Sequence, residues 1–406
     1  MSRIEELIAQ YCPAGVAFRG IGEVCRILNG YAFKSEKYSA TGIRVIRISD
    51  VQKGRMSDND LKFYPVELQN EIRNFLLNEG DLVMSLTGNV GRVAMLAKTD
   101  LPAALNQRVA CIRPKSEIVL TRYLFHLLDS SAFENNAMAN ATGGGQKNMS
   151  TGWLSSYAIP IPPLEVQQEI VKILDAFTEL EAELEAELEA RRIQYNYYRD
   201  RLLTFEDGEV EWKTLGDIGD VKMCKRILKN ETKPEGDIPF YKIGTFGKQA
   251  DAFIPKEIYE SYKNRYSFPK RGDVLISASG TIGRTVIYDG EPAYFQDSNI
   301  VWLDNDESIV TNRYLWHFYK VAKWFVSDGG TIDRLYNDNI RKTKILIPYP
   351  NDPEKSIEEQ TRIIAILDTF DALTHSLSEG LPAEIAARRR QYEHYRNRLL
   401  TFKEAA

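Results

Sequence analysis

Hydrophobic residues recur at every third or fourth position along the middle of the chain. Between Glu165 and Phe205 they form a single stripe, and glutamates occupy much of the remaining surface. The residues of the stripe are Ile170, Ile173, Leu174, Phe177, Leu180, Leu184 and Leu188. This spacing predicts one amphipathic helix of about 40 residues, which at ~1.5 Å per residue would be roughly 60 Å long. Because a helix with such an apolar stripe is not stable alone in water, we expect a partner helix to cover the stripe.

A second stripe near the C-terminus offers that partner. Its residues are Ile363, Ile366, Leu367, Phe370, Leu373 and Leu377. We expect this helix to break at Gly380-Leu381-Pro382, because proline interrupts the hydrogen-bond ladder, and to resume from Ala383. The two helices are expected to pack antiparallel along a coiled-coil seam. Two separate surface helices on their own domains remain an alternative.

The blocks 15–163 and 206–352 show shorter, mixed signals. Runs rich in Val and Ile predict strands at Ile43–Ile48, Asp81–Met84 and Val274–Ile276. Helical patterns cover Arg122–Leu128 and Arg313–Val321, and glycine-rich turns stand at Thr142–Gly145 and Gly329–Gly330. The pattern predicts an α+β fold, with two mixed α/β domains joined by two long antiparallel helices.

The second half of the chain repeats the first with a period of about 190 residues. Arg122-Tyr123-Leu124-Phe125-His126 returns as Arg313-Tyr314-Leu315-Trp316-His317, and the segment Ala190–Phe205 returns as Ala387–Phe402. Between these marks the two halves diverge freely. A plain tandem duplication explains the similarity but not its uneven spread, which is typical of two modules that read different targets on one scaffold.

The chain ends extend the repeat. The expected helix Arg3–Gln10 precedes the first module as the helix end Arg199–Phe205 precedes the second. We infer a cyclic, pseudo-two-fold arrangement with the termini close together. The predicted organisation is an N-terminal helix that completes the repeat (1–14), a first domain (15–163), a central helix (164–205), a second domain (206–352) and a C-terminal helix (353–406).

Composition and charge narrow the function only slightly. The 406 residues are 43% hydrophobic and 11% aromatic, which suffices for the cores of two or three domains. No run approaches the roughly 20 apolar residues of a membrane span, and the N-terminus lacks a signal peptide's apolar block, so we expect a cytoplasmic protein. The net charge is −5, but the acidity is concentrated in residues 161–190, and the first domain is mildly basic. Charge therefore leaves nucleic-acid binding open.

Candidate chemistry is scarce. The scattered cysteines Cys12, Cys25, Cys111 and Cys224 form no CxxC pair, so we expect buried thiols rather than a metal site or a disulfide framework. The turns Thr87–Arg92 and Ser279–Arg284 lack the spacing and the lysine of a phosphate-binding loop, and hairpin turns between strands explain them better. Dinucleotide, amino-methyltransferase, nuclease and serine-hydrolase motifs are not found. We expect no catalytic residue and no bound cofactor in this chain.

With the repeat and the helices in place, the whole chain resembles the specificity subunits of type I restriction–modification systems. The most specific marks are Thr142–Gln146 leading to Ile159–Gln167, and the paired segments Gln194–Phe205 and Gln391–Phe402. The second copy departs from the first where Asn351-Asp352-Pro353 replaces the Pro-Pro-Leu entry to the helix, which we expect to loosen the helix start there.

The resemblance implies two target-recognition domains, each of which reads one half of a split, asymmetric site on double-stranded DNA. The helices would set the spacer and dock two methyltransferase subunits, with restriction–translocase subunits added for cleavage. S-adenosylmethionine, ATP and Mg²⁺ would then be bound by the partner subunits. A stand-alone bipartite DNA-binding regulator or architectural protein is the runner-up, and a fused enzyme with its own methylation or cleavage activity is a weaker alternative.

DNA contacts should divide into phosphate-positioning and base-reading sets. The expected phosphate contacts are Lys34, Arg47, Arg92 and Lys147 in the first domain, and Lys225, Lys242 and Arg284 in the second. The expected base readers are Ser85, Thr87, Asn106, Gln107 and Gln146, followed by Ser277, Ser279, Gln296 and Asp297. Because Arg92 and Arg284 recur at equivalent places, they are also candidates for scaffold salt bridges.

Overall fold

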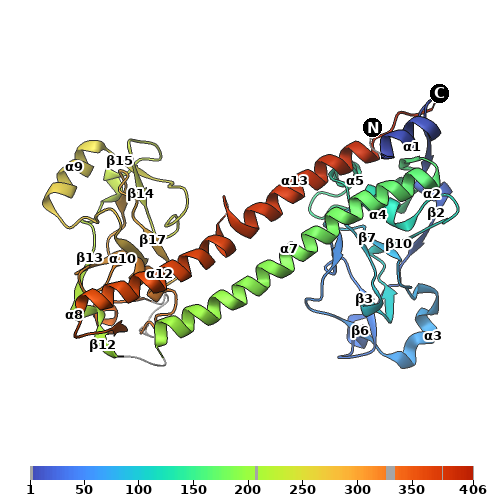
Figure 1. The fold of residues 1–406 in the computed structure, drawn as a ribbon. Helices are drawn as coiled ribbons and strands as arrows, with labels where there is room; N and C mark the ends of the chain where they lie inside the picture. The colour runs from blue at the N-terminus through green and yellow to red at the C-terminus, as the bar shows by residue number, and fades with distance from the viewer. Residues whose placement is uncertain (1–2, 206–208, 326–333, 377, 406) are drawn as a thin grey trace. The chain divides into compact units, whose positions relative to one another are not determined.

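The computed structural model describes residues 3–205, 209–325, 334–376 and 378–405. The chain divides into two compact units (Figure 1). The first unit holds residues 1–185 together with 384–406, and the second holds residues 186–383. The predicted turn Gly329–Gly330 and the predicted stripe residue Leu377 lie outside the described residues.

The first unit contains a four-stranded sheet in the order β2-β10-β7-β8 and a three-stranded sheet in the order β6-β3-β9. Two further strand pairs are β1-β11 and β4-β5. The strands are β1 (Ala17–Gly20), β2 (Cys25–Asn29), β3 (Ile43–Ile46), β4 (Val51–Gln52), β5 (Arg55–Met56), β6 (Phe63–Tyr64), β7 (Leu82–Ser85), β8 (Val93–Met95), β9 (Ala103–Leu105), β10 (Val109–Pro114) and β11 (Ala158–Ile161). The short helices are α1 (Arg3–Tyr11), α2 (Ile21–Val24), α3 (Gln69–Ile72), α4 (Thr121–Leu128), α5 (Ser131–Asn140) and α6 (Thr151–Ser156).

The second unit repeats this plan, which confirms the internal repeat read from the sequence. Its sheets run β13-β19-β16-β17 and β15-β14-β18, and β12 pairs with β20. The strands are β12 (Val210–Thr214), β13 (Gly219–Lys222), β14 (Ile238–Tyr241), β15 (Phe253–Ile254), β16 (Val274–Ser277), β17 (Thr285–Ile287), β18 (Tyr294–Phe295), β19 (Ile300–Asn305) and β20 (Lys344–Pro348). The short helices are α8 (Leu215–Ile218), α9 (Lys256–Arg265), α10 (Asn312–Tyr319) and α11 (Asn337–Lys342).

The long helices follow the hydrophobic stripes. Helix α7 is unbroken from Leu164 to Thr204, which confirms the predicted central helix. The C-terminal stripe forms α12 (Pro353–His375) and α13 (Gly380–Leu400). The C-terminal helix is interrupted as predicted, but the interruption lies before Gly380. Its predicted position at Gly380–Pro382 was therefore wrong by a few residues. Pro382 lies in the first turn of α13, where a missing N–H breaks no helical hydrogen bond.

The start of α12 also corrects an expectation. The side chain of Asp352 accepts a hydrogen bond from the backbone N–H of Lys355 at 3.1 Å, and Pro353 follows directly as the first helical residue. An aspartate cap followed by proline is a favourable helix start. The helix entry in the second copy is therefore well capped rather than loosened.

Helix packing inside each unit is antiparallel, as predicted. In the first unit Phe177 of α7 stacks on Tyr395 of α13 with ring centroids 5.4 Å apart, while Arg389, earlier on α13, contacts Glu181 and Glu185, later on α7. In the second unit Tyr198 of α7 stacks on Phe370 of α12 at 5.6 Å. Aromatic and ionic pairs thus supplement the apolar seam.

In each unit a buried glutamine at an equivalent position of the repeat attaches the domain to the long helix that follows it. Gln167 accepts a hydrogen bond from the N–H of Leu120 and donates to the carbonyl of Ile118, both at 2.9 Å. Gln360 makes the equivalent bonds with Thr311 at 3.0 Å and Ile309 at 2.8 Å. Both glutamines are fully buried. They orient the helix against the domain, and sequence reasoning did not single them out.

An ion pair crosses the same domain–helix junction in both units, but its charges are exchanged. In the first unit the helix residue Arg396 contacts Asp129, which follows α4, with a nitrogen–oxygen distance of 3.1 Å. In the second unit Lys320, which follows α10 and matches Asp129 in the repeat, contacts the helix residue Asp371 at 2.7 Å. The position that matches Asp371 in the first unit is Thr178.

The two units also share a buried histidine. His126 of α4 and His317 of α10 are fully buried, and their Nε2 atoms lie 2.8 Å from Asp175 and 2.7 Å from Asp368. Both histidines belong to the segment that recurs in the sequence repeat. Burial lowers the pKa of both imidazoles, and it lowers that of His317 to about 4 despite the opposing effect of Asp368.

We predict a pH dependence of unfolding from His317. Because the unfolded chain binds a proton near pH 6.5 and the folded chain only near pH 4, acidification favours the unfolded state in that window. His317 should lower the free energy of unfolding by about 2–3 kcal/mol between pH 7 and pH 4. Urea unfolding of His317→Gln, which keeps a donor for Asp368 but does not titrate, should lack this decrement. His394→Gln at an exposed position is the control, and equal pH slopes for all three proteins would contradict the prediction.

The two ends of the described chain meet in the first unit, as expected (Figure 1). The N–H of Val16 donates to the carbonyl of Lys403 at 2.9 Å, and the N–H of Ala405 donates back to Val16 at 2.9 Å. Glu5 of α1 pairs with Arg398 of α13 at 3.2 Å. Of the helices within the described ranges, none combines the length and apolar character that crossing a membrane requires.

Candidate nucleic-acid interface

In the first unit three loops meet at the tip of the β7–β8 hairpin. The N–H of Leu86 donates to the carbonyl of Arg108, and the N–H of Gly88 donates to the carbonyl of Lys147, both at 2.9 Å. The hydroxyl of Thr87 lies 2.6 Å from the side-chain oxygen of Asn148. We call residues 86–92, 106–108 and 142–148 the first tip cluster.

The second unit builds the same junction at the β16–β17 hairpin. The N–H of Ala278 donates to Asn299 at 2.7 Å, and the hydroxyl of Ser279 lies 2.8 Å from the side-chain oxygen of Asn299. The N–H of Leu335 donates back to Ala278 at 2.8 Å. Residues 278–284, 296–299 and 334–336 form the second tip cluster. Both hairpins confirm the predicted turns between strands.

The hydroxyl candidates among the expected base readers point inward. Ser85 and Ser277 are buried, and their hydroxyls donate to the carbonyls of Asn89 and Thr281 within their own hairpin turns. Thr87 and Ser279 are also buried and bonded to the asparagines named above. These four side chains hold the tips in shape, so we leave them out of the contact surface.

The amide candidates of the first unit lie at the surface of its tip cluster. Gln107, Gln146 and Lys147 are exposed, while Asn106 is half-buried and its side-chain oxygen accepts the N–H of Arg108 at 3.1 Å. A side chain built on Gly88 would lie 4.0 Å from the amide nitrogen of Gln146, so Gln146 lies close to the hairpin tip. Exposed donors and acceptors here can meet base edges.

The amide and acid candidates of the second unit are tied to neighbours. Gln296 is half-buried, and its side-chain oxygen accepts the N–H of Ile243 at 3.0 Å. Asp297 pairs with Arg226 at 2.9 Å. Lys225 is exposed beside the ring of Tyr266, 5.2 Å from its centroid. The second cluster thus presents charged and paired groups where the first presents amides.

The expected phosphate contacts divide into exposed and bonded cations. Lys34 is exposed, as is Lys147. Arg92 donates to the side chain of Gln52 at 3.0 Å, and Arg284 donates to the carbonyl of Phe246 at 3.1 Å. Arg92 therefore braces its hairpin against strand β4, and Arg284 braces its hairpin against the loop that follows β14, in keeping with the scaffold alternative.

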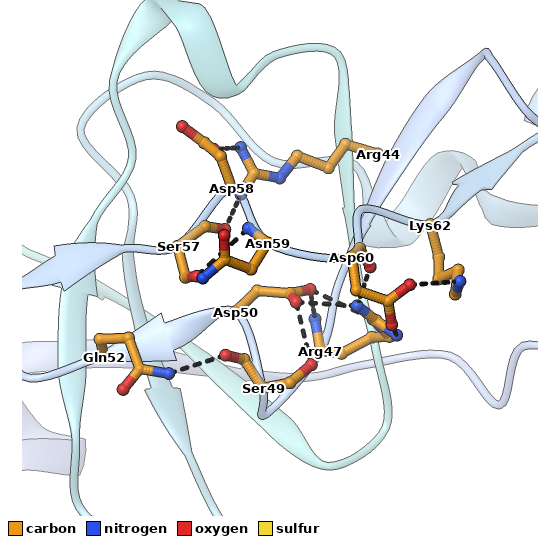
Figure 2. A network of polar contacts seen from close by, with 10 residues as sticks. All are labelled: Arg44, Arg47, Ser49, Asp50, Gln52, Ser57, Asp58, Asn59, Asp60 and Lys62. Atoms are coloured by element: carbon orange, nitrogen blue, oxygen red, sulfur yellow. Dashed lines mark hydrogen bonds and ion pairs between the residues drawn. The ribbon is translucent and has the colours of Figure 1, made fainter. Parts of the chain in front are cut away.

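Two more of these cations lie in acidic surroundings. Figure 2 shows Arg47 between Asp50, at 3.0 Å, and Asp60, at 3.4 Å. Lys242, at the matching place in the second unit, pairs with Asp251 at 2.8 Å. A phosphate would compete with these carboxylates for both cations.

Sequence reasoning missed three cations that lie in the tip clusters or are paired with them. Arg108 is exposed between Gln107 and the start of β10, and Arg226 follows Lys225 and pairs with Asp297. Arg334 belongs to the second cluster through its bridge to Ser279. Their proximity to the predicted residues along the chain was the available signal for Arg108 and Arg226. Arg334 had no local signal, because contacts with residues far away in the chain, Ser279 and Ser298, bring it to the tip.

The chain matches a known protein family in both of its halves. Residues 13–190 and 208–387 each match one family model, described as the type I restriction modification DNA specificity domain. The chain is 52% identical over 305 residues to S.HindORF215P of Haemophilus influenzae, named as a type I restriction enzyme specificity subunit, which covers 73% of this chain and 76% of that protein. It is 35% identical over 275 residues to the EcoR124I/EcoR124II specificity subunit of Escherichia coli, covering 62% and 65%.

Solved structures agree at the level of the fold. The S subunit of a type I restriction–modification system from M. genitalium aligns over 95% of this chain and 96% of its own, with a TM-score of 0.54 and 16% identity. A chain from a structural study of type I R-M complex assembly aligns over 96% and 98%, with a TM-score of 0.61 and 19% identity. The likeness covers both units and the long helices.

Proposed function

The chain belongs to the type I restriction–modification DNA specificity family, and from this premise we propose that its two units each read one half of a split, asymmetric DNA site. The observation that carries the proposal is the pair of tip clusters, which share one backbone frame but differ in their polar groups. Asn106-Gln107-Arg108 stands in the first where Gln296-Asp297-Ser298 stands in the second. Amides can read adenine, arginine guanine and aspartate cytosine, so the two halves of the site would differ.

The helices would hold the assembly together. In this proposal they dock two methyltransferase subunits and set the length of the unread spacer, with restriction–translocase subunits added for cleavage. In this proposal the partner subunits bind S-adenosylmethionine, ATP and Mg²⁺, and this chain supplies no catalytic group. The unbroken course of α7 supports the role of a spacer, because a continuous helix transmits both length and rotation.

Co-expression with a cognate methyltransferase subunit tests the proposal. Single-molecule sequencing of the host DNA should map N6-methyladenine to a split motif with a fixed gap, and the signal should vanish when this chain is omitted. Tight DNA binding by the chain alone, with no methylation in the co-expressing cells, would instead favour a stand-alone DNA-binding protein. Methylation by the purified chain alone would favour a fused enzyme.

We predict that Lys147→Ala weakens DNA binding without changing the preferred sequence. Lys147 is exposed in the first tip cluster, and an ammonium there would neutralise one phosphate. Its loss should lower the slope of log affinity against log salt by about one. Titration of labelled duplexes over a range of salt concentrations measures the slope. The control is Lys115→Ala, because the exposed Lys115 follows the last residue of β10, whereas the tip-cluster residues 106–108 precede its first residue. An equal slope change in both variants would contradict the assignment.

A further inference from the structure

A buried arginine fills one site of the first unit. Arg44 of β3 is 5% exposed, and its guanidinium lies 2.6 Å from Asp100 and 3.1 Å from Asp58. It also donates to the carbonyl of Ser57 at 2.7 Å. Figure 2 shows Arg44 reaching Asp58 and the backbone beside it. Two carboxylates and a carbonyl thus hold one guanidinium at this site.

Proline replaces this arginine in the second unit. Strand β3 pairs in parallel with β9, with Arg44 opposite Ala103 and Ile46 opposite Leu105. Strand β14 pairs in parallel with β18, with Tyr241 opposite Phe295. This register places Pro239 where the first unit has Arg44.

A half-open pocket of about 280 Å³ lies beside Pro239. Its aromatic walls are Tyr241, Phe246, Tyr288 and Phe295. Phe246, Tyr288 and Phe295 are buried, and Tyr241 stacks on Phe295 with ring centroids 5.9 Å apart. No residue of the second tip cluster lines the pocket, although Arg284 of that cluster donates to the carbonyl of the lining residue Phe246 at 3.1 Å.

The charged lining favours a cation. The exposed carboxylates of Asp289 and Glu291 line the pocket from the loop between β17 and β18, where the first unit has Asp100 between β8 and β9. Lys248 is the one cation among the lining residues. Aromatic faces together with two carboxylates attract planar cations, and guanidinium groups stack on aromatic rings better than ammonium groups do.

We propose that the pocket beside Pro239 binds a guanidinium group from outside the second unit, in the place that the side chain of Arg44 takes in the first. The group is either a small free guanidine compound or the arginine side chain of another polypeptide. The first unit carries its own guanidinium, and the second offers two acidic residues, Asp289 and Glu291, at the pocket edge, where the carboxylate of Asp289 also accepts the N–H of Glu291 at 3.0 Å.

Nuclear magnetic resonance of the full chain with labelled tyrosine and phenylalanine rings tests the proposal. Methylguanidinium should shift the rings of Tyr241 and Phe246 with saturation in the millimolar range, and methylammonium at equal ionic strength should bind several-fold more weakly. The peptide acetyl-Gly-Arg-Gly-amide is the second arm. Tighter binding by the peptide identifies an arginine side chain as the natural group, and tighter binding by methylguanidinium identifies a small compound.

Matched variants distinguish binding in the pocket from general electrostatic attraction to the protein surface. The double variant Asp289→Asn, Glu291→Gln should weaken methylguanidinium binding by about tenfold or more, while Glu257→Gln on the exposed surface of α9 should leave it unchanged. Pro239→Arg should abolish the shifts, because its own guanidinium would fill the pocket. Absence of saturable shifts in the unaltered chain, shifts that survive in the double variant, or equal binding of methylammonium would overturn the proposal.

Discussion

Adding one Glu-Ala-Glu-Leu unit after Leu184 should move DNA methylation to a motif whose spacer is about one base pair longer. Four residues lengthen a helix by ~6 Å and rotate its end by about 400°, a net turn of ~40°. One base pair turns DNA by roughly 35°, since a helical turn holds about 10–10.5 pairs. The inserted unit continues the existing repeat, so the apolar stripe of α7 is kept. Methylation of the original motif should fall to background.

Methylome sequencing of cells that express the variant with the methyltransferase subunits measures this directly. Glu183→Gln with Glu187→Gln changes the charge of the same stretch but not its length, and its motif should stay the same. If the four-residue insertion leaves the gap unchanged while methylation persists, α7 does not set the spacer. The two half-sites should be unaltered in every case, because the insertion lies outside both tip clusters.

Replacing Arg396 with alanine should lower the free energy of unfolding by about 3–5 kcal/mol, because it leaves a buried carboxylate without its partner. The Arg396 side chain is only 2% exposed and lies 3.1 Å from Asp129. Burial raises the pKa of Asp129 to about 6 even though Arg396 opposes that rise. Without the arginine, Asp129 should take up a proton at a still higher pH.

Urea unfolding of the full chain measures this loss. Arg389→Ala is the matched control on the same helix, because its 55% exposed side chain pairs with glutamates at the surface. Pairs of this kind contribute about 1 kcal/mol or less. The double variant Arg396→Met, Asp129→Leu should recover most of the stability, since apolar residues of similar size can replace a buried ion pair. Equal losses for Arg396→Ala and Arg389→Ala would count against the assignment.

The sequence predicted the features that depend on periodicity and local spacing. The stripe from Ile170 to Leu188 gave the central helix, and the repeat gave the matching sheets. It could not give the orientation of Ser85 and Ser277, because all four residues of β7 and of β16 are buried. Strands buried on both faces lack the alternation that distinguishes an inward from an outward side chain.

The candidate site was harder to predict than the fold for a related reason. The tip clusters depend on hydrogen bonds between segments far apart in the chain, such as Thr87 with Asn148 and Ala278 with Asn299. The bonds of Arg92 and Arg284 to distant loops are equally non-local. Residue type and equivalent position indicated which side chains to consider, but only the packing separates exposed amides such as Gln146 from hydroxyls used inside a turn.

The exchanged ion pair at the domain–helix junction bears on how such genes can recombine. A hybrid that placed the second domain on the first unit's helices would bring Lys320 next to Arg396, with Thr178 where its acid partner should be. The reciprocal hybrid would bring Asp129 next to Asp371, but also next to Arg199, which matches Arg396 in the repeat. Only the first hybrid would therefore leave two like charges at the part-buried junction without an opposite charge. A crossover that joins the second domain to the first unit's helices should cost more stability than the reciprocal crossover.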